Sequence, residues 1–275
     1  MDGELGDFLR SRRARIQPEE VGLPSHGRRR VPGLRREEVA QLAGVSVDYY
    51  IRLEQGRGPS VSDAVLDAIA RVLRLDETEH AYLLTVARPH KKGSTARPAR
   101  PRVRPGVQLL LDGMERTPAF VLGRRMDVLA WNALGDAVNG FSALAPADRN
   151  IPRQVFLDPA AAGFYPDWAA VAAQTVANLR IDAGHHPDDP RMAALVGELS
   201  LKSADFRRLW ADHEVKECAY GTKRIQHPVA GLLTLPYETL TVPTDPDQTI
   251  VAYTPEPGSE TAERLALLGS WATTA

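Results

Sequence analysis

The sequence lacks the features of a secreted or membrane-bound protein. Cys218 is its only cysteine, so no disulfide can form within the chain and nothing indicates an oxidising compartment. No apolar run approaches the roughly 20 residues that a helix needs to span a bilayer. The N-terminal stretch MDGELGDFLRSRR has no apolar core behind its charges, so we expect no signal peptide. These absences predict a cytoplasmic protein with no membrane partner.

Sequence signatures of catalysis are also missing. The chain holds no phosphate-binding P-loop, no GxSxG nucleophile elbow, no HExxH zinc motif and no glycine fingerprint after a strand. His185 and His186, followed by Asp188 and Asp189, stand before a proline without regular spacing. We expect a solvated loop there rather than a metal site. The sequence therefore predicts a protein that is not an enzyme and holds neither metal nor cofactor.

What the chain does have is a division of charge. Residues 1–105 hold 20 Lys and Arg against 14 Asp and Glu, whereas residues 106–275 hold 14 against 21. A basic half joined to an acidic half indicates that only the first meets nucleic acid. With 275 residues and 43% hydrophobic content, each half is large enough to bury its own core.

Residues 34–56, LRREEVAQLAGVSVDYYIRLEQG, predict two short helices joined by a tight turn. Val39 and Leu42 give the first helix an inward face, Gly44 ends it, and Ser46 suits the N-cap of the second. At 100° per residue, Tyr49, Tyr50 and Leu53 share one side of the second helix. Any helical hairpin needs a glycine turn and an apolar seam, but the length, the spacing and the flanking arginines favour a helix-turn-helix.

The opposite side of that second helix suits a DNA major groove. Val47 and Ile51 could touch a thymine methyl group, and Asp48 could accept a hydrogen bond from a cytosine amino group. For Asp48 the alternative is a favourable charge in the first helical turn. Arg35 and Arg36, at a helix start, suit backbone phosphates. The predicted contacts with double-stranded operator DNA are Arg35, Arg36, Ser46, Val47, Asp48, Ile51, Arg52 and Arg57.

Helices before and after this motif complete an all-α domain over residues 1–88. The first runs from about Leu5 to Arg15, another opens at Ser60, and Asp76 caps the last, which ends near Ala87. Residues 89–105 contain prolines and basic residues with almost nothing apolar. This composition predicts a semi-extended linker.

Residues 106–275 mix helices with strands. A helix is expected at 107–116, two strands flank a turn at 123–125, and helices follow at about 167–181, 190–199 and 203–212. Strand-forming stretches then precede a closing helix near 260–271. Helices set against an antiparallel sheet make the chain α+β.

The pattern L-x-x-E-E-V-A-x-L-A-G-V-S-x-x-x-Y-x-x-x-L-E-x-G resembles the XRE-type, lambda-repressor-like helix-turn-helix domains. In that class the positions of Arg13 and Glu54 form a structural ion pair. With GLPSHGRRRVPG, DVLAWN, FLDPAAAGFYPDW and GTKRIQHPVAGLLTLPYETL, the chain resembles the MmyB-like bacterial regulators. This resemblance implies a PAS-like sensor domain at 106–275 and a small lipophilic ligand such as a fatty acid.

Residue chemistry adds candidates for the ligand site. Tryptophan and phenylalanine side chains could line a pocket, although aromatics on helix faces also serve as plain core. Arg180 could meet a ligand carboxylate or form an ion pair with Asp182 or Asp205, and His213 shares a helix face with Trp210. The predicted ligand contacts are Trp131, Phe156, Trp168, Arg180, Trp210 and His213.

These interpretations together predict a one-component transcription regulator that acts as a homodimer. A ligand that prefers one arrangement of the domains would shift the population able to bind operator DNA. The alternative is a DNA-binding regulator whose second domain only dimerises or binds another protein, without a ligand.

Overall fold

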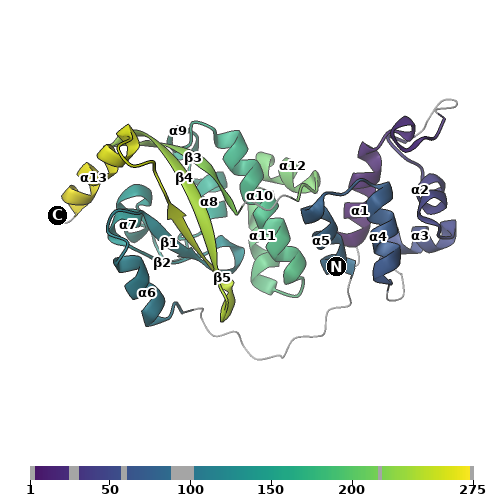
Figure 1. Cartoon of the computed structure of the whole chain (residues 1–275), viewed down its shortest axis with the longest axis horizontal. Helices are drawn as coiled ribbons and strands as arrows, with labels where there is room; N and C mark the ends of the chain where they lie inside the picture. The colour runs from purple at the N-terminus through teal and green to yellow at the C-terminus, as the bar shows by residue number, and fades with distance from the viewer. Residues whose placement is uncertain (1–3, 25–30, 57–60, 88–101, 216–218, 273–275) are drawn as a thin grey trace. The chain divides into compact units, whose positions relative to one another are not determined.

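The computed structural model describes residues 4–24, 31–56, 61–87, 102–215 and 219–272. They fall into two compact units (Figure 1). Unit 1 comprises residues 1–95 with 183–189 and 210–217, and unit 2 comprises 96–182, 190–209 and 218–275. Most of the expected linker lies outside the described residues, so its extended character stays a prediction.

Unit 1 is helical, as expected. Its described helices are α1 (Glu4–Arg15), the short 3-10 helix η1 (Pro18–Val21), α2 (Arg36–Ala43), α3 (Val47–Glu54), α4 (Asp63–Val72) and α5 (Glu77–Ala87). Phe8, Val39 and Tyr50 are fully buried, and the Phe8 and Tyr82 rings meet edge to face with centroids 5.1 Å apart. One apolar core thus joins α1, α2, α3 and α5.

Three expectations for unit 1 can be compared with the structure. The side chain of Asp76 accepts a hydrogen bond from the Glu79 backbone N–H at 2.8 Å, which confirms Asp76 as the cap of α5. The prediction that Leu42 points inward is wrong, because Leu42 is 39% exposed while Ala40 is buried. The helix expected to open at Ser60 begins at Asp63 with Ser62 as its N-cap.

Unit 2 is built around a five-stranded sheet with the strand order β2-β1-β5-β4-β3. All neighbouring strands are antiparallel. The strands are β1 (Ala119–Leu122), β2 (Val128–Trp131), β3 (Tyr220–His227), β4 (Gly231–Val242) and β5 (Asp245–Tyr253). The sheet confirms the α+β expectation, and β1 and β2 flank the turn that the sequence predicted.

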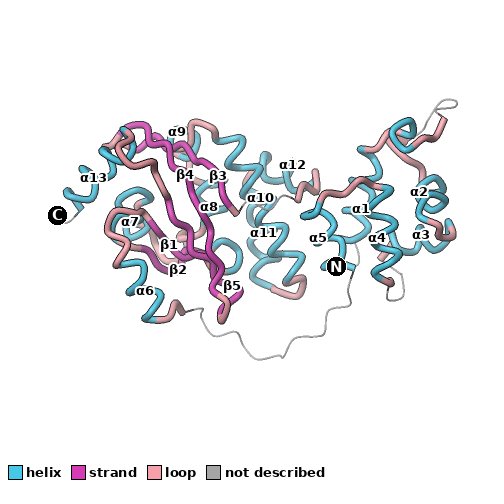
Figure 2. Tube along the Cα trace, in the orientation of Figure 1, coloured by secondary structure: helices cyan, strands magenta, loops and turns pink. Residues whose placement is uncertain are grey.

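Helices cover both faces of this sheet (Figure 2). On one face α6 (Pro105–Asp112) contributes Leu111, which clusters with Val121 and Ile250. On the other face a larger core includes Phe120, Val171 and Leu233. The remaining described α-helices of the C-terminal half are α7 (Ala133–Asn139), α8 (Ile151–Leu157), α9 (Ala161–Phe164), α10 (Trp168–His185), α11 (Pro190–Lys202), α12 (Ala204–Ala211) and α13 (Glu260–Ala272).

Helices α7, α8 and α9 were not predicted, because each has seven residues or fewer and shows no full period of apolar residues. Local caps define two of them. Asn132 accepts a hydrogen bond from Gly135 N–H at 2.7 Å, and Asn150 accepts one from Arg153 N–H at 3.1 Å. Asparagine is a strong N-cap residue, so the sequence did indicate where α7 and α8 begin.

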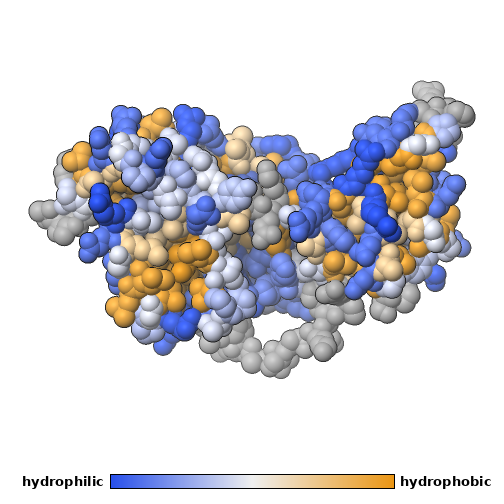
Figure 3. All heavy atoms as spheres, in the orientation of Figure 1, coloured by the Kyte–Doolittle hydropathy of each residue, from blue (hydrophilic) through white to orange (hydrophobic). Residues whose placement is uncertain are grey.

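Some apolar side chains of unit 2 remain on its surface. Leu109 and Leu110 of α6 are 71% and 52% exposed. Figure 3 shows apolar residues gathered on this face of the unit, in the region of α6 and the neighbouring strands. Among the described residues, no helix has the length and apolar character required to cross a membrane.

Candidate functional site

The turn between α2 and α3 has the geometry that the sequence predicted. Gly44 follows α2 in the left-handed region, with φ of 70°, where a side chain would be strained. Ser46 is the N-cap of α3, and its hydroxyl accepts a hydrogen bond from the Tyr49 backbone N–H at 3.2 Å. These two residues fix where α3 begins and therefore which of its side chains face outward.

The exposed side of α3 presents the residues expected to read DNA. Tyr50 and Leu53 are buried in unit 1, which leaves Val47, Asp48 and Arg52 exposed. Short side chains at the start of a helix, followed by one arginine, suit a helix that enters a major groove. Ser46 is also exposed, Ile51 is partly buried, and Arg57 lies outside the described residues.

The two arginines at the start of α2 differ in their surroundings. Arg35 is the exposed N-cap residue. Arg36 Nε donates to Glu54 Oε2 at 2.6 Å, and this hydrogen bond, with the adjacent carboxylate charge, raises the pKa of Arg36. The Glu54 side chain is only 1% exposed. Arg36 is therefore tied to the interior of the motif through Glu54, a partner that the sequence interpretation did not predict.

Glu54 has a second cationic partner. Arg13 Nε donates to Glu54 Oε1 at 2.8 Å, and Arg13 Nη1 donates to the Leu34 carbonyl at 2.7 Å. The structural ion pair expected between Arg13 and Glu54 is thus confirmed. It joins α1 to the end of α3, while Arg36 joins α2 to the same carboxylate. A buried carboxylate with two guanidinium partners specifies the relative placement of three helices.

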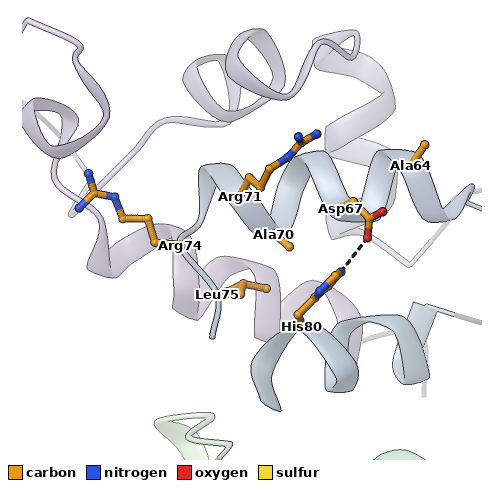
Figure 4. Close-up of a pocket in the computed structure, with 7 residues that line it drawn as sticks. All are labelled: Ala64, Asp67, Ala70, Arg71, Arg74, Leu75 and His80. Atoms are coloured by element: carbon orange, nitrogen blue, oxygen red, sulfur yellow. Dashed lines mark hydrogen bonds and ion pairs between the residues drawn. The ribbon is translucent and has the colours of Figure 1, made fainter. Parts of the chain in front are cut away.

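A groove of about 690 Å³ lies beside α4 and α5 in unit 1 (Figure 4). His80 Nε2 lies 2.8 Å from Asp67 Oδ1 across it. Its lining combines charged side chains with small apolar ones, which does not match a closed apolar site for a lipophilic ligand. The lining residues are Ala64, Asp67, Ala70, Arg71, Arg74, Leu75 and His80.

Three predicted ligand contacts lie against the main core of unit 2. Phe156 meets Trp168 edge to face with ring centroids 6.0 Å apart, and Trp168 Nε1 donates to the Val155 carbonyl at 2.9 Å. Trp131 lies against Phe141 with centroids 5.6 Å apart. All three are only partly buried, so they are aromatic side chains of the core that keep accessible surface.

The other predicted ligand contacts are distributed differently. Arg180 is 1% exposed and belongs to unit 2, whereas Trp210 and His213 belong to unit 1. The His213 carbonyl accepts a hydrogen bond from Arg12 Nη2 at 2.7 Å. The structure therefore groups Trp131, Phe156 and Trp168 in one core and assigns Trp210 and His213 to the other unit.

A lysine that the sequence interpretation missed lies on the face of the sheet that packs against the main core of unit 2. Along β3 the exposed residues alternate with Gly221, Lys223, Ile225 and His227. The last two are buried, so Lys223 points toward the same core. Its Nζ lies 5.8 Å from the centre of the Tyr165 ring and 5.9 Å from that of Tyr237. A period-2 reading of the strand could have identified it.

The surroundings of Lys223 are aromatic and amide in character. Tyr237 pairs with Gly221 on β3 and with Tyr253 on β5, and its hydroxyl accepts a hydrogen bond from Gln174 Nε2. Burial lowers the pKa of Lys223 to about 8 and raises the pKa values of Tyr165 and Tyr253. We name Lys223, Tyr165, Tyr237, Tyr253 and Gln174 the lysine–tyrosine cluster.

The part of the chain that the structure describes contains no group of three or more His, Cys, Asp and Glu side chains arranged to hold a metal ion. The expectation of a loop at the adjacent histidines is wrong for the first of them, because α10 continues through His185. Cys218 lies outside the described residues.

Comparison with protein families gives two matches. The model of a helix-turn-helix domain matches residues 4–83, and the model of the MmyB-like transcription regulator ligand binding domain matches residues 103–268. A comparison with curated proteins gave no match. The first region contains the exposed side of α3, and the second contains the sheet, its helices and the lysine–tyrosine cluster. The chain therefore belongs to the MmyB-like transcription regulators, which join a DNA-binding helix-turn-helix to a ligand-binding domain.

Proposed function

We propose that this protein is a one-component regulator in the cytoplasm, where it binds operator DNA through α3 and a small lipophilic ligand, such as a fatty acid, through residues 106–275. The observation that carries the DNA half is the exposed side of α3, with Val47, Asp48 and Arg52 turned away from a core made by Tyr50 and Leu53. The chain has no role as an enzyme in this proposal.

For the DNA half, the predicted phosphate and base contacts have different roles. Arg35 and Arg57 neutralise phosphates, which gives affinity for any sequence. Ser46, Val47, Asp48, Ile51 and Arg52 stand where a groove-bound helix meets base edges. Arg36 contributes to the same surface mainly by holding α2 against Glu54.

For the ligand half, the partly buried aromatic side chains of the unit 2 core support the proposal. Trp131, Phe156 and Trp168 keep accessible surface although they pack against buried residues. An apolar ligand gains free energy by covering such surface. The five-stranded antiparallel sheet with the strand order β2-β1-β5-β4-β3 supports the PAS-like interpretation of this unit.

A homodimer would bring two copies of α3 to two half-sites of an operator. The exposed leucines of α6 support this part of the proposal, because single exposed leucines are common but a gathered apolar face often marks an interface. The second candidate, a C-terminal domain that only dimerises, rests on the same face. Sedimentation of the wild type and of Leu110→Glu distinguishes a dimer held by this face from other assemblies.

The experiment that tests the ligand half is native purification followed by release of bound small molecules and mass spectrometry. A lipophilic ligand present in stoichiometric amount, whose addition changes operator affinity in fluorescence anisotropy, supports the sensor. A protein that binds operator DNA but neither retains a lipophilic ligand nor responds to one would favour the dimerisation module.

A further inference from the structure

Lys223 is an unusual residue at its position. The helix-covered side of an antiparallel sheet is normally filled by apolar side chains, and lysine is almost never enclosed unless it is paired. Here the neighbouring residues on the same side of β3 are glycine, isoleucine and histidine. Leu235, directly opposite Lys223 on β4, is fully buried.

Among the described residues, no carboxylate is paired with Lys223. Its Nζ contacts the rings of Tyr165 and Tyr237, and Lys223 forms no hydrogen bond or ion pair within the described ranges. The neighbouring Arg224 faces the exposed side of β3, where it pairs with Asp167 at 3.4 Å. Cation–π contacts offset only part of the cost of enclosing a charge.

Lys223 is nevertheless not completely enclosed. As a residue it is only partly buried, although Tyr165 and Tyr237 beside it are 5% and 7% exposed. Three strands and two helical segments supply the cluster, with Tyr165 following α9 and Gln174 coming from α10 (Figure 1). Because Lys223 keeps part of its surface, a small charged group could approach it from that side.

We propose that Lys223 binds the carboxylate of the ligand, with the hydroxyl of Tyr237 beside it and the aromatic side chains of the core around the ligand's apolar part. This inference rests on the proposed ligand-sensing function. A carboxylate places one negative charge against one ammonium group, which removes the unpaired charge. A phosphate dianion would require more cationic donors than the cluster supplies. The assignment replaces Arg180 as the residue that meets the carboxylate.

The tyrosine rings and Gln174 act as positioning groups. The Nζ atom of Lys223 lies 5.8 Å and 5.9 Å from the centres of the Tyr165 and Tyr237 rings, and the amide of Gln174 donates to the Tyr237 hydroxyl, which fixes where that hydroxyl lies. The same geometry offers an alcohol only an uncharged hydrogen bond, so the site should distinguish an acid from the matching alcohol.

The test compares dodecanoate with 1-dodecanol, using the full chain after removal of bound lipid. Isothermal titration at pH 7 should show a preference of the wild type for dodecanoate. Lys223→Met should weaken dodecanoate binding at least tenfold and change dodecanol binding less than twofold. Lys202→Met is the matched control, because Lys202 is 61% exposed and pairs with Glu198 at the surface. It should change neither affinity.

A second measurement follows Lys223 in the wild-type protein, so its result does not depend on how a variant folds. The chain has five lysines, so the Lys223 ammonium can be followed by NMR of lysine-labelled wild type, with Lys223→Arg used only for assignment. Saturating dodecanoate should raise the pKa of Lys223, and dodecanol should not. A merely structural lysine would show the same pKa with either compound.

The outcomes separate the two proposals. Equal losses for acid and alcohol in Lys223→Met, or a Lys223 pKa unchanged by dodecanoate, would overturn the carboxylate assignment while the sensor stands. A wild type that binds operator DNA but neither dodecanoate nor dodecanol would overturn the assignment together with the lipophilic sensor.

Discussion

Arg36 and Glu54 form an ion pair with Nε and Oε2 2.6 Å apart, so the first residue of α2 is tied to the last residue of α3. This contact changes what a substitution at Arg36 should do. The Arg36 side chain is 41% exposed, yet the side chain of its partner Glu54 is almost completely buried. Its loss would therefore weaken the packing of the helix-turn-helix as well as the charge of the DNA-facing surface.

We expect Arg35→Ala and Arg36→Ala to have separable effects. Arg35→Ala should leave the free energy of unfolding nearly unchanged and flatten the salt dependence of DNA affinity by roughly one unit of slope. Arg36→Ala should lower the free energy of unfolding by about 1 kcal/mol, because Arg13 still pairs with Glu54. Urea titration and salt-dependent anisotropy measure the two quantities. Identical behaviour of the two variants in both assays would contradict this distinction.

Gly6 allows α1 to approach the end of α3. A Cβ atom at this position would lie 1.9 Å from the backbone carbonyl oxygen of Glu54, which is far inside contact distance. We expect Gly6→Ala to destabilise the protein by about 3 kcal/mol, because backbone on both sides must move. Circular dichroism during urea unfolding measures the change.

The matched control is Gly197→Ala on α11. Gly197 is exposed and a Cβ atom there meets nothing within 4 Å. This change should stabilise the chain by about 0.5 kcal/mol, since alanine has less freedom to lose in a helix. If Gly6→Ala were as stable as the wild type, α1 and α3 would have to lie farther apart than the structure places them.

Asp48 and Arg52 should determine base preference. Both are exposed on α3, so Asp48→Ala and Arg52→Ala should each alter the preferred base at particular operator positions by roughly 1–3 kcal/mol. Selection from random DNA, followed by anisotropy on the selected sites, measures this. If the Asp48 charge only stabilises the first turn of α3, Asp48→Ala will lower the free energy of unfolding and still select the parental operator.

The sequence predicted best where local chemistry determines structure. Gly44, Ser46 and Asp76 were assigned correctly because a left-handed turn and two caps depend on residues close in the chain. Leu42 was misassigned because α2 has only eight residues, and so short a helix does not define its buried side. Its orientation follows from packing against α3 and α4, which the sequence of α2 does not encode.

The candidate ligand site was less accessible to sequence reasoning. Lys223, Tyr165 and Tyr237 are distant along the chain and meet only because β3 pairs with β4 and α9 packs beside β3. Arg180 was chosen from an apolar helix stripe, a pattern that also describes an ordinary core. Pairing and packing between distant segments, rather than local periodicity, bring the cluster together.

The enclosed ammonium of Lys223 should also make stability depend on pH. Burial lowers the pKa of Lys223, which lies beside the Tyr165 and Tyr237 rings, from 10.5 to about 8. Below pH 8 the lysine is charged in both the folded and the unfolded chain, so the folded state carries the whole cost of the charge. Between pH 8 and 10.5 the folded state loses its proton first, and the cost declines as the pH rises.

Lys223→Met removes this cost without changing the length of the side chain much. We expect the ligand-free variant to be more stable than the wild type by about 2 kcal/mol at pH 7, a value that allows for partial screening of the charge by solvent. At pH 9.5 the gain should be less than half as large, because most of the wild-type lysine is then neutral in the folded state. Urea unfolding at the two pH values measures this difference in the free energy of unfolding. Lys202→Met is the control, and it should show no gain in stability at either pH. A gain for Lys223→Met that is the same at both pH values would assign the effect to packing and contradict an enclosed, charged lysine.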